Sequence, residues 1–261
     1  MSLEYAPQGL VGLLTPQANT TVEPEAWALL PEGFSLVNAR MVSDAPSLNQ
    51  RLLDYVWHVD KSLAQFANAP LSVVSLACTG SSYLMGKQAE ARWVDDWQQR
   101  LQRPVVTAGL AVVQALRALN AQRIDLVSPY PDDLTQASRA YWMSHGFEIG
   151  DVQVVTTPEQ GFHAIYLTST QAATQAAQRL TQSTADAVLM LGTGMPTLKT
   201  LLAQRGQGGP PMLSSMLALM WQSVSQIGGS SVDHRRISHN IHDWLHATHW
   251  AVRAQTMGIE P

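Results

Sequence analysis

The chain of 261 residues is predicted to adopt an α/β fold with two pseudo-symmetric Rossmann-like lobes, each a four-stranded parallel sheet flanked by helices. Three observations predict this fold: short apolar runs, helical patterns between them, and a repeat of the same order in the second half. Runs that are apolar on both faces are typical of parallel strands covered on both sides. Helices alternating with such strands indicate right-handed crossovers. We therefore expect two facing lobes with a site in the cleft between them.

Eight runs rich in Val, Leu and Ile are the expected strands. They are residues 9–14, 35–39, 71–77 and 105–107 in the first half, and 124–128, 152–156, 187–191 and 212–214 in the second. Helices are expected over residues 48–67, 89–101, 110–120, 134–145, 170–182 and 197–205, with a final helix over 237–254 that packs back on one lobe. The expected division is a first lobe over 1–118, joined by the C-terminal helical segment 229–261, and a second lobe over 119–228.

The composition excludes several classes of protein. The chain is 46% hydrophobic and 14% charged, so a sizeable core is expected rather than disorder. The formal net charge is −4, whereas nucleic-acid-binding proteins are typically basic, so a nucleic-acid partner is not indicated. No apolar stretch approaches the roughly 20 residues that a membrane span needs, and the first residues lack the pattern of a signal peptide. We expect a cytoplasmic protein without nucleic-acid or membrane partners.

The ends of the expected strands carry the repeat most clearly. Thr15-Pro16 in the first half matches Ser128-Pro129 in the second, and Cys78-Thr79-Gly80 matches Gly192-Thr193-Gly194. Ligands of open α/β sheets bind beyond the carboxyl ends of the strands, so these segments are expected to meet in one cleft. The one cysteine of the chain therefore faces a glycine in its twin position.

Cys78 is the candidate reactive group. It follows an apolar run and precedes a small, polar stretch that suits a turn from strand to helix. A thiol near a helix N-terminus is expected to have a lowered pKa and to favour the thiolate. The alternative is that Cys78 is a small buried apolar residue.

The neighbouring positions supply candidate hydrogen-bond donors. Thr79, Gly80, Thr193 and Gly194 bring hydroxyls and unhindered N–H groups that suit a carboxylate or an enolate oxygen, although such pairs also make tight turns. Tyr130 lies at the corresponding place in the second lobe, where its phenol donates to a substrate or only packs.

Asn19 follows the first expected strand and has two interpretations that are compatible. Asn19 or Thr20 caps the next helix, with Glu23 closing a capping box. Alternatively, Asn19 and nearby amides bind a carboxylate.

No metal or cofactor is expected. His239, His242, His246 and His249 would form one stripe on the final helix, for which a solvated or interface face is favoured over a metal site. The sequence contains no glycine-rich phosphate loop and no dinucleotide-binding fingerprint.

Four segments together resemble the aspartate/glutamate racemase superfamily, and within it the branch of maleate cis-trans isomerases and arylmalonate decarboxylases. The segments are Leu13-Leu14-Thr15-Pro16-Gln17-Ala18-Asn19-Thr20-Thr21-Val22-Glu23, Ala77-Cys78-Thr79-Gly80, Ser128-Pro129-Tyr130 and Leu191-Gly192-Thr193-Gly194-Met195-Pro196. The resemblance covers residues 9–225. It implies an enzyme with strand-end cysteines on opposite faces of the substrate and no metal or organic cofactor.

The resemblance also assigns roles to the residues. In maleate isomerases the first-lobe cysteine adds to the double bond and the second-lobe cysteine assists protonation, whereas arylmalonate decarboxylases keep only the second. Here Cys78 matches the first and Gly192 stands in place of the second, which is the mirror image of the decarboxylase pattern. Asn19, Thr79 and Tyr130 match substrate-binding positions. Their neighbours complete the expected binding set, namely Gly80, Gly192, Thr193 and Gly194.

The predicted function is that of a cofactor-independent decarboxylase acting on a small dicarboxylic acid, with Cys78 as the proton donor to an enediolate. Two-base racemisation is disfavoured because a glycine cannot exchange a proton. One alternative is a maleate cis-trans isomerase-like enzyme with Cys78 as covalent nucleophile. Another is a dicarboxylate-binding protein without catalytic activity. The resemblance also makes a homo-oligomer a candidate assembly.

Overall fold

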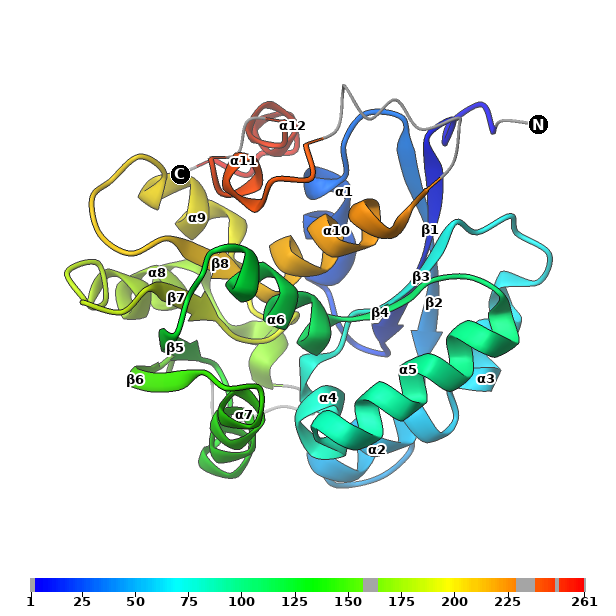
Figure 1. Ribbon diagram of the computed structural model, residues 1–261, viewed down its shortest axis with the longest axis horizontal. Helices are drawn as coiled ribbons and strands as arrows, with labels where there is room; N and C mark the ends of the chain where they lie inside the picture. The colour runs from blue at the N-terminus through cyan, green and yellow to red at the C-terminus, as the bar shows by residue number, and fades with distance from the viewer. Residues whose placement is uncertain (1–2, 157–163, 229–237, 247–248, 261) are drawn as a thin grey trace.

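The structure is a computed structural model that describes residues 3–156, 164–228, 238–246 and 249–260 (Figure 1). It contains two four-stranded parallel sheets with helices around them, which confirms the predicted fold. Both sheets have the same strand order, because the third strand of each half pairs with the first and the fourth pairs with the third. The repeat seen in the sequence is therefore a repeat of topology.

The first sheet has the order β2-β1-β3-β4. Its strands are β1 (Gly9–Pro16), β2 (Phe34–Met41), β3 (Val73–Leu76) and β4 (Val105–Thr107). Strands β1 and β3 are buried along their whole length, as expected of central parallel strands that helices cover on both faces. Their carboxyl ends place Pro16 and Cys78 side by side at one edge of the sheet, because Leu14 of β1 is in register with Leu76 of β3.

The second sheet has the order β6-β5-β7-β8. Its strands are β5 (Arg123–Ser128), β6 (Glu148–Val154), β7 (Ala187–Met190) and β8 (Met212–Ser214). The prediction of a strand over 152–156 was wrong at its start. Strand β6 is a partly exposed edge strand that begins at Glu148, so its first residues form no continuous apolar run.

The helices agree with the predicted ranges except in three places. They are α1 (Val22–Leu29), α2 (Leu48–Trp57), α3 (Val59–Leu63), α4 (Thr79–Met85), α5 (Lys87–Leu101), α6 (Ala108–Ala118), α7 (Asp132–Ser144), α8 (Thr170–Gln178), α9 (Leu198–Gln204), α10 (Ser215–Gln226), α11 (Ile241–Leu245) and α12 (Ala251–Thr256), with short 3-10 turns η1 (Ala64–Phe66) and η2 (Ala164–Leu167). The helix expected over 48–67 is broken at His58, whose backbone leaves the helical region. Helix α10 was not predicted, and α1 and α4 were expected only as the helices that follow Asn19 and Cys78, without a range.

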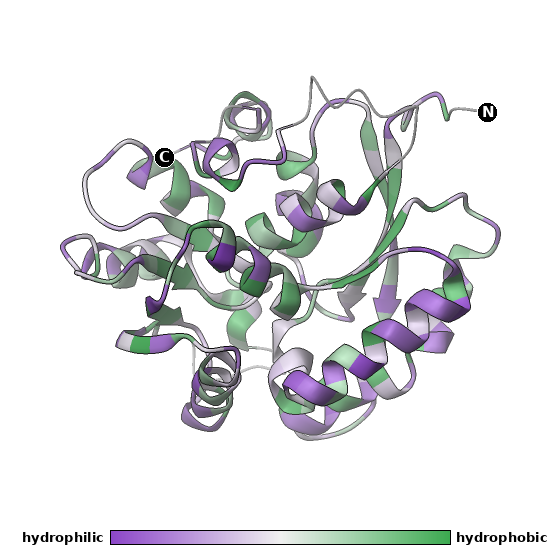
Figure 2. Cartoon of the chain, viewed as in Figure 1, coloured by the Kyte–Doolittle hydropathy of each residue, from purple (hydrophilic) through white to green (hydrophobic). Residues whose placement is uncertain are grey.

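Helices α6 and α10 form the centre of the molecule (Figure 1). They occupy equivalent places in the repeat, since α6 follows β4 and α10 follows β8, and they pack against each other between the two sheets. A buried hydrogen bond of 2.7 Å between the hydroxyls of Ser75 and Ser223 ties α10 to β3. By contrast, the outer helix α5 is largely hydrophilic (Figure 2). The core therefore holds the lobes together along this helix pair.

The third difference is the C-terminal segment, which is not one helix. Helix α11 ends at Leu245 and α12 begins at Ala251, whereas residues 229–237 and 247–248 of the expected segment lie outside the described residues. His249 has a ring nitrogen 3.1 Å from the carbonyl oxygen of Leu29, and Arg253 donates to that of Leu30, so α12 lies against α1. The histidines consequently form no single stripe.

In the described part of the chain, no helix is long and apolar enough to cross a membrane. Among the same residues, no group of three or more His, Cys, Asp or Glu side chains is placed to hold a metal ion.

Candidate active site

A cavity of about 580 Å³ opens between the two lobes, at the carboxyl ends of the strands. Residues that follow β1, β3, β5 and β7 all line it, as the repeat predicted. The predicted site residues that line the cavity are Asn19, Cys78, Thr79, Gly80, Tyr130, Thr193 and Gly194. Gly192, which is not among the lining residues, lies directly behind the Tyr130 hydroxyl.

Cys78 is the N-terminal cap of α4 and has extended backbone, directly after strand β3. Its side chain is buried, with only 4% of the residue exposed. Burial raises the pKa of the Cys78 thiol, and hydrogen bonds from Ser81 and from the backbone at Ser81 and Gly80 offset this only in part. The prediction of a lowered pKa was therefore wrong, because desolvation of the thiolate outweighs the donors at the helix N-terminus.

The Ser81 hydroxyl connects the thiol to α2. It donates to the carbonyl oxygen of Leu52 at 2.6 Å and lies 3.2 Å from Cys78 Sγ. A hydroxyl has one hydrogen, and the shorter bond holds it on Leu52. The Ser81 hydroxyl is therefore a weak donor to the sulfur, the backbone at Gly80 and Ser81 supplies the others, and burial outweighs all of them.

Gly192 is a glycine for two physical reasons. Its φ of +84° lies in the left-handed region that side chains disfavour. A Cβ atom at this position would also lie 2.9 Å from Tyr130 Oη and 3.3 Å from Tyr130 Cζ. The space of a second-lobe side chain is therefore taken by the Tyr130 hydroxyl.

Thr79 and Tyr130 form a hydrogen-bonded pair across the cleft, with 2.9 Å between Thr79 Oγ1 and Tyr130 Oη. Tyr130 is 8% exposed, and its ring meets that of Tyr83 edge-on with centroids 6.0 Å apart. Burial raises the pKa of Tyr130, so its phenol stays protonated and can donate a hydrogen bond. These two residues are brought together as donors at the cavity wall.

Thr193 has a different role from the one predicted for its hydroxyl. Thr193 Oγ1 donates to the carbonyl oxygen of Ala77 at 2.7 Å, which joins the second lobe to the end of β3. A hydroxyl engaged in this way is not a donor to the cavity. The contribution of Thr193 and Gly194 to the wall is therefore their backbone.

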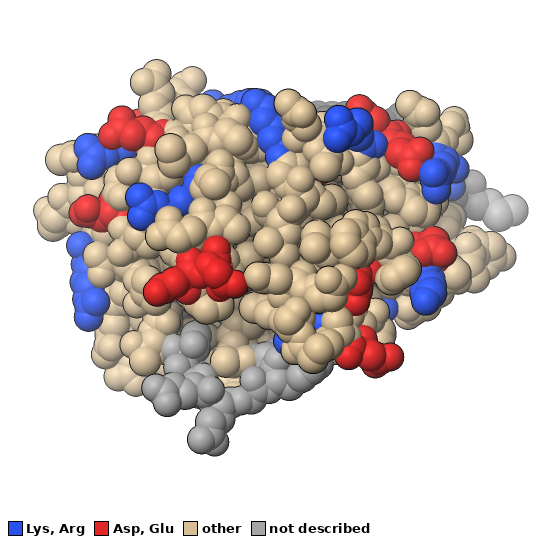
Figure 3. Space-filling model, turned by 90° about the horizontal axis from the view of Figure 1, so that it is seen from below, with Lys and Arg blue, Asp and Glu red and all other residues tan. Residues whose placement is uncertain are grey.

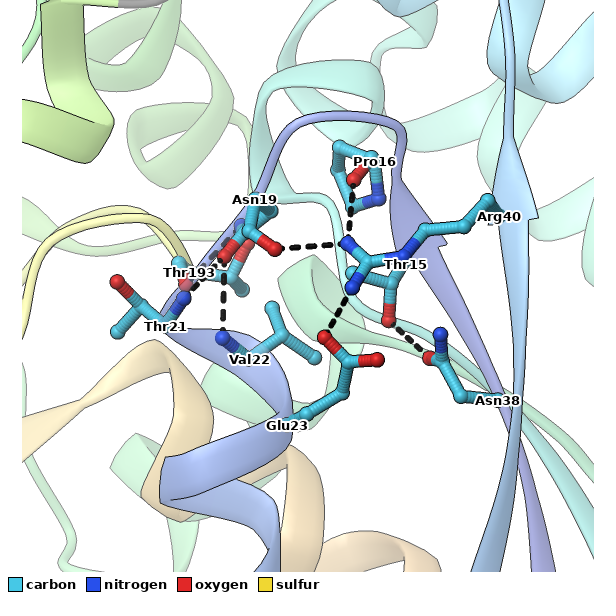
Figure 4. A network of polar contacts seen from close by, with 9 residues as sticks. All are labelled: Thr15, Pro16, Asn19, Thr21, Val22, Glu23, Asn38, Arg40 and Thr193. Atoms are coloured by element: carbon cyan, nitrogen blue, oxygen red, sulfur yellow. Dashed lines mark hydrogen bonds and ion pairs between the residues drawn. The ribbon is translucent and has the colours of Figure 1, made fainter.

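Asn19 holds the turn after β1 and also touches the second lobe (Figure 4). Its Oδ1 accepts from the backbone N–H groups of Thr21 at 2.8 Å and Val22 at 3.0 Å, and its Nδ2 donates to the carbonyl oxygen of Thr193 at 3.3 Å. Asn19 therefore accepts from N–H groups at the start of α1, but the N-cap residue is Thr21 and not Asn19 or Thr20 as predicted. The predicted capping box is wrong, because Glu23 pairs with Arg40 instead.

Glu25 makes a further connection between the lobes. The carboxylate of this α1 residue accepts from the N–H groups of Thr197 and Leu198 and from the Thr197 hydroxyl, and so caps α9 of the other lobe. Glu25 is 4% exposed, and burial raises its pKa from 4.5 to about 7 against the opposing effect of these hydrogen bonds. One lobe thus supplies the helix cap of the other.

Several wall residues escaped the sequence analysis because they lie outside the repeated segments that located the site. They lie in α2, β6 and η2 and the residues beside them: Leu48, Arg51, Leu52, Val154, Val155, Ile165 and Tyr166. Only α2 carried a signal. Leu48, Arg51 and Leu52 share one face of that helix, where an arginine interrupts an apolar pattern.

The class of protein is defined by two similar α/β lobes with a strand-end thiol at the cavity between them. The family model described as arylmalonate decarboxylase matches residues 11–236, and the chain belongs to this family. Its relatives are enzymes, which confirms the predicted class of decarboxylase or cis-trans isomerase.

Relatives of both kinds resemble the chain. A maleate isomerase of Nocardia farcinica is 29% identical over 80% of this chain and 86% of its own, and an arylmalonate decarboxylase of Bordetella bronchiseptica is 23% identical over 88% and 95%. A maleate isomerase of Pseudomonas putida is 29% identical, and the match spans 57% of this chain and 64% of the relative's length.

Solved structures of maleate isomerases have the same fold as this chain. The maleate isomerase Iso of Pseudomonas putida S16 has a TM-score of 0.75 at 23% identity, over 83% of this chain and 92% of that one. The maleate cis-trans isomerase of Nocardia farcinica with a covalently bound succinylcysteine intermediate has a TM-score of 0.74 at 26% identity, over 84% and 92%.

Proposed function

We propose that the protein decarboxylates a substituted malonate without a cofactor, and that Cys78 protonates the resulting enediolate. The observation that carries this proposal is the buried thiol at the cavity wall, whose pKa is raised and whose counterpart at the end of β7 is the glycine Gly192. A nucleophile must be a thiolate, whereas a proton donor must keep its proton until the carbanion forms. The raised pKa of Cys78 favours the second role.

The reaction follows from the donors around the thiol. The bond from the α-carbon to one carboxylate breaks, carbon dioxide leaves, and the electron pair passes into an enediolate of the retained carboxylate. The hydroxyl pair of Thr79 and Tyr130 and the backbone of Gly80 and Gly194 line the cavity where this charge develops. Cys78 then transfers its proton to the α-carbon and is reprotonated from water.

The handedness of the product follows from the lobe that holds the acid. Cys78 ends a strand of the first lobe, whereas the resemblance places the acid of arylmalonate decarboxylases in the second. Protonation from the opposite face gives a product of the opposite hand.

The shape of the cavity supports a substrate with a sizeable substituent. About 580 Å³ lies within the range of roughly 300–1,000 Å³ that is typical of small-molecule sites. Much of the wall is apolar, with Leu48, Leu52, Leu134, Val154, Val155 and Ile165. These side chains suit a hydrocarbon substituent.

A second candidate is a maleate-type isomerase in which Cys78 adds to the double bond. The similarity to maleate isomerases favours it, in particular to the structure that carries a succinylcysteine. Hydrogen bonds to the sulfur from Ser81 and Gly80 would also stabilise a thiolate once it forms.

The deciding experiment incubates the protein with substituted malonates and with maleate in heavy water and follows both by proton NMR. Decarboxylation is expected to release carbon dioxide and to give a monoacid with one deuterium at the α-carbon, of one hand. A trans diacid, together with a mass increase of one dicarboxylate on Cys78, would establish the isomerase instead. Ligand-induced thermal stabilisation without any product would identify a dicarboxylate-binding protein.

A further inference from the structure

Glu90 of α5 is a buried carboxyl that the proposed reaction does not use. Acidic and basic side chains lie on the surface of the face shown in Figure 3, whereas none of the Glu90 surface is exposed. The buried residues of α5 are Glu90 and the apolar Val94. Burying a carboxyl costs free energy unless hydrogen bonds compensate for it, so the partners of Glu90 indicate what this carboxyl holds in place.

The two oxygens of Glu90 accept from hydroxyls of different lobes. Thr107 Oγ1, at the end of β4, donates to Oε1 at 2.6 Å. Tyr141 Oη of α7 donates to Oε2 at 2.5 Å, and this bond crosses from the first lobe to the second. Gly109 of α6 leaves room for that hydroxyl, because a Cβ atom there would lie 2.7 Å from Tyr141 Oη. Glu90 therefore holds the Tyr141 hydroxyl at a defined place.

The Tyr141 ring belongs to an aromatic cluster that ends at the cavity. The Tyr83 ring of α4 meets Tyr141 with centroids 5.4 Å apart and meets Trp142 at 5.5 Å. The same Tyr83 ring meets Tyr130 edge-on at 6.0 Å. Tyr130 lines the cavity, and its hydroxyl lies 2.9 Å from Thr79 Oγ1. Close-packed rings transmit a displacement to their neighbours, so the place of Tyr141 affects the place of Tyr130.

Helix α7 provides a second connection from Tyr141 to Tyr130. It begins at Asp132, directly after the Tyr130-Pro131 turn, and the Thr135 hydroxyl in its first turn donates to the carbonyl oxygen of Tyr130 at 3.1 Å. It packs on α4, whose first residue is Thr79 (Figure 1). A tilt of α7 would therefore change the distance between the hydroxyls of Tyr130 and Thr79.

We propose that Glu90 is a positioning residue, which holds the Tyr130 hydroxyl against Thr79 through Tyr141. This inference rests on the proposed function, because it takes the Tyr130 hydroxyl as a donor to the charge that develops on the substrate. Such donors act when they are preorganised, and a displacement of about 1 Å can lower the rate by about 10²-fold. Glu90 itself does not line the cavity, so it acts on the reaction through the donor pair.

The first test needs no substrate. Tyrosine labelled with ¹³C at Cζ gives one NMR signal for each of the six tyrosines, and the signal missing from Tyr130→Phe is that of Tyr130. Glu90→Leu is expected to shift this signal, and Glu90→Gln, which keeps an acceptor for Tyr141, to shift it less. Tyr141→Phe keeps the ring and is expected to shift it as well, which tests the proposal even if Glu90→Leu does not fold.

The matched control is Lys87→Met, because Lys87 Nζ makes another bond between α5 and α7, to the carbonyl oxygen of Ser144 at 3.0 Å. Its loss should leave the Tyr130 signal in place. An unchanged Tyr130 signal in Glu90→Leu or in Tyr141→Phe would overturn the proposal.

The second test measures the decarboxylation of a substituted malonate. Glu90→Leu is expected to lower kcat about 10-fold with little change in KM, because the donors bind the transition state more strongly than the substrate. In the Tyr130→Phe background the same change is expected to lower kcat by less than about 2-fold, because the positioned hydroxyl is gone. Ser223→Ala removes a buried bond to Ser75 and is the control for a loss of stability alone, with kcat unchanged.

The two tests separate this inference from the proposed function. If no malonate is decarboxylated but the Tyr130 signal moves in Glu90→Leu, the proposed function is wrong and the positioning role stands. If malonate is decarboxylated and the losses from Glu90→Leu and Tyr130→Phe are additive, Glu90 does not act through Tyr130, and the positioning role alone is wrong.

Discussion

The turns after β3 and β7 occupy the same place in two sheets of identical strand order, yet they differ in backbone and in chemistry. Cys78 has an extended backbone with φ of −147°, and helix α4 begins at the next residue. Gly192 has φ of +84°, and the next helix begins only at Leu198. Burial constrains the strands of both lobes alike, whereas the turns beyond them are free to diverge. The site is therefore asymmetric within a symmetric scaffold.

The largest expected effect comes from removing the thiol of the first lobe. Cys78→Ala is expected to lower kcat on the preferred malonate by about 10²- to 10⁴-fold, the usual contribution of a positioned general acid. The loss is measured as the rate of carbon dioxide release. Ser81→Ala is the comparison variant, because it alters a neighbour of the sulfur and leaves the thiol in place. Full turnover by Cys78→Ala would show that the difference between the lobes has no chemical meaning.

The second effect tests the donor that fills the space beside Gly192. Tyr130→Phe removes the hydroxyl that pairs with Thr79 Oγ1. A drop in kcat of about 10²- to 10³-fold is expected, as for the loss of one donor to a developing oxyanion. Tyr83→Phe, whose ring packs against Tyr130 outside the cavity, is the control and should change kcat by much less. If both variants lowered kcat equally, the Tyr130 hydroxyl would have no role as a donor, and Tyr130 would serve only in packing.

The strands and the location of the site could be predicted because burial leaves a pattern in the sequence. The run ending at Leu14 and the run ending at Leu76 are apolar on both faces, and such runs have few alternatives to a central parallel strand. Once the strands were placed, the rule for ligands at strand ends located Cys78 and Tyr130. Strand β6 lacked this pattern because it is an edge strand in which every residue is exposed or half-buried.

The electrostatics and the walls of the site depend on tertiary contacts and could not be predicted. A helix N-terminus lowers a thiol pKa only if solvent or charge supports the thiolate, and burial reverses the direction for Cys78. Likewise, Asn19 could be recognised as an acceptor for the start of α1, but its contact with Thr193 crosses 174 residues of sequence. Arg51 required knowledge of how α2 packs on α4.

The third effect concerns the carboxylate that couples the lobes. The pKa of Glu25 is raised to about 7 in the folded protein from 4.5, so its protonated form is the one that folding favours. Its contribution to the free energy of unfolding is fully present below pH 4.5 and is lost as the pH rises through about 7. The loss amounts to about 3 kcal/mol.

Glu25→Gln keeps the shape of the protonated carboxyl and should remove this pH dependence. Urea unfolding at a series of pH values from 4 to 8 measures the difference in free energy between the two proteins. As the pH rises, the parent protein is expected to lose free energy of unfolding relative to Glu25→Gln. Glu32→Gln, on an exposed loop, is the control. A constant difference across the range would show that Glu25 is ionised in both states and that α9 is capped by a charged group.

The smallest effect restores the missing side chain of the second lobe. Gly192→Cys is expected to lower the free energy of unfolding by about 1–3 kcal/mol, because φ at this position is positive and the new Cβ meets Tyr130 Oη at 2.9 Å. Tyr130→Phe removes that oxygen, so the double variant should recover part of the loss, and the strain from φ remains. Urea unfolding of the two single variants and the double variant gives the coupling energy. If Gly192→Cys alone were as stable as the parent protein and produced a racemic product, the space beside Tyr130 would be large enough for a second thiol, and the asymmetry of the lobes would depend on one residue only.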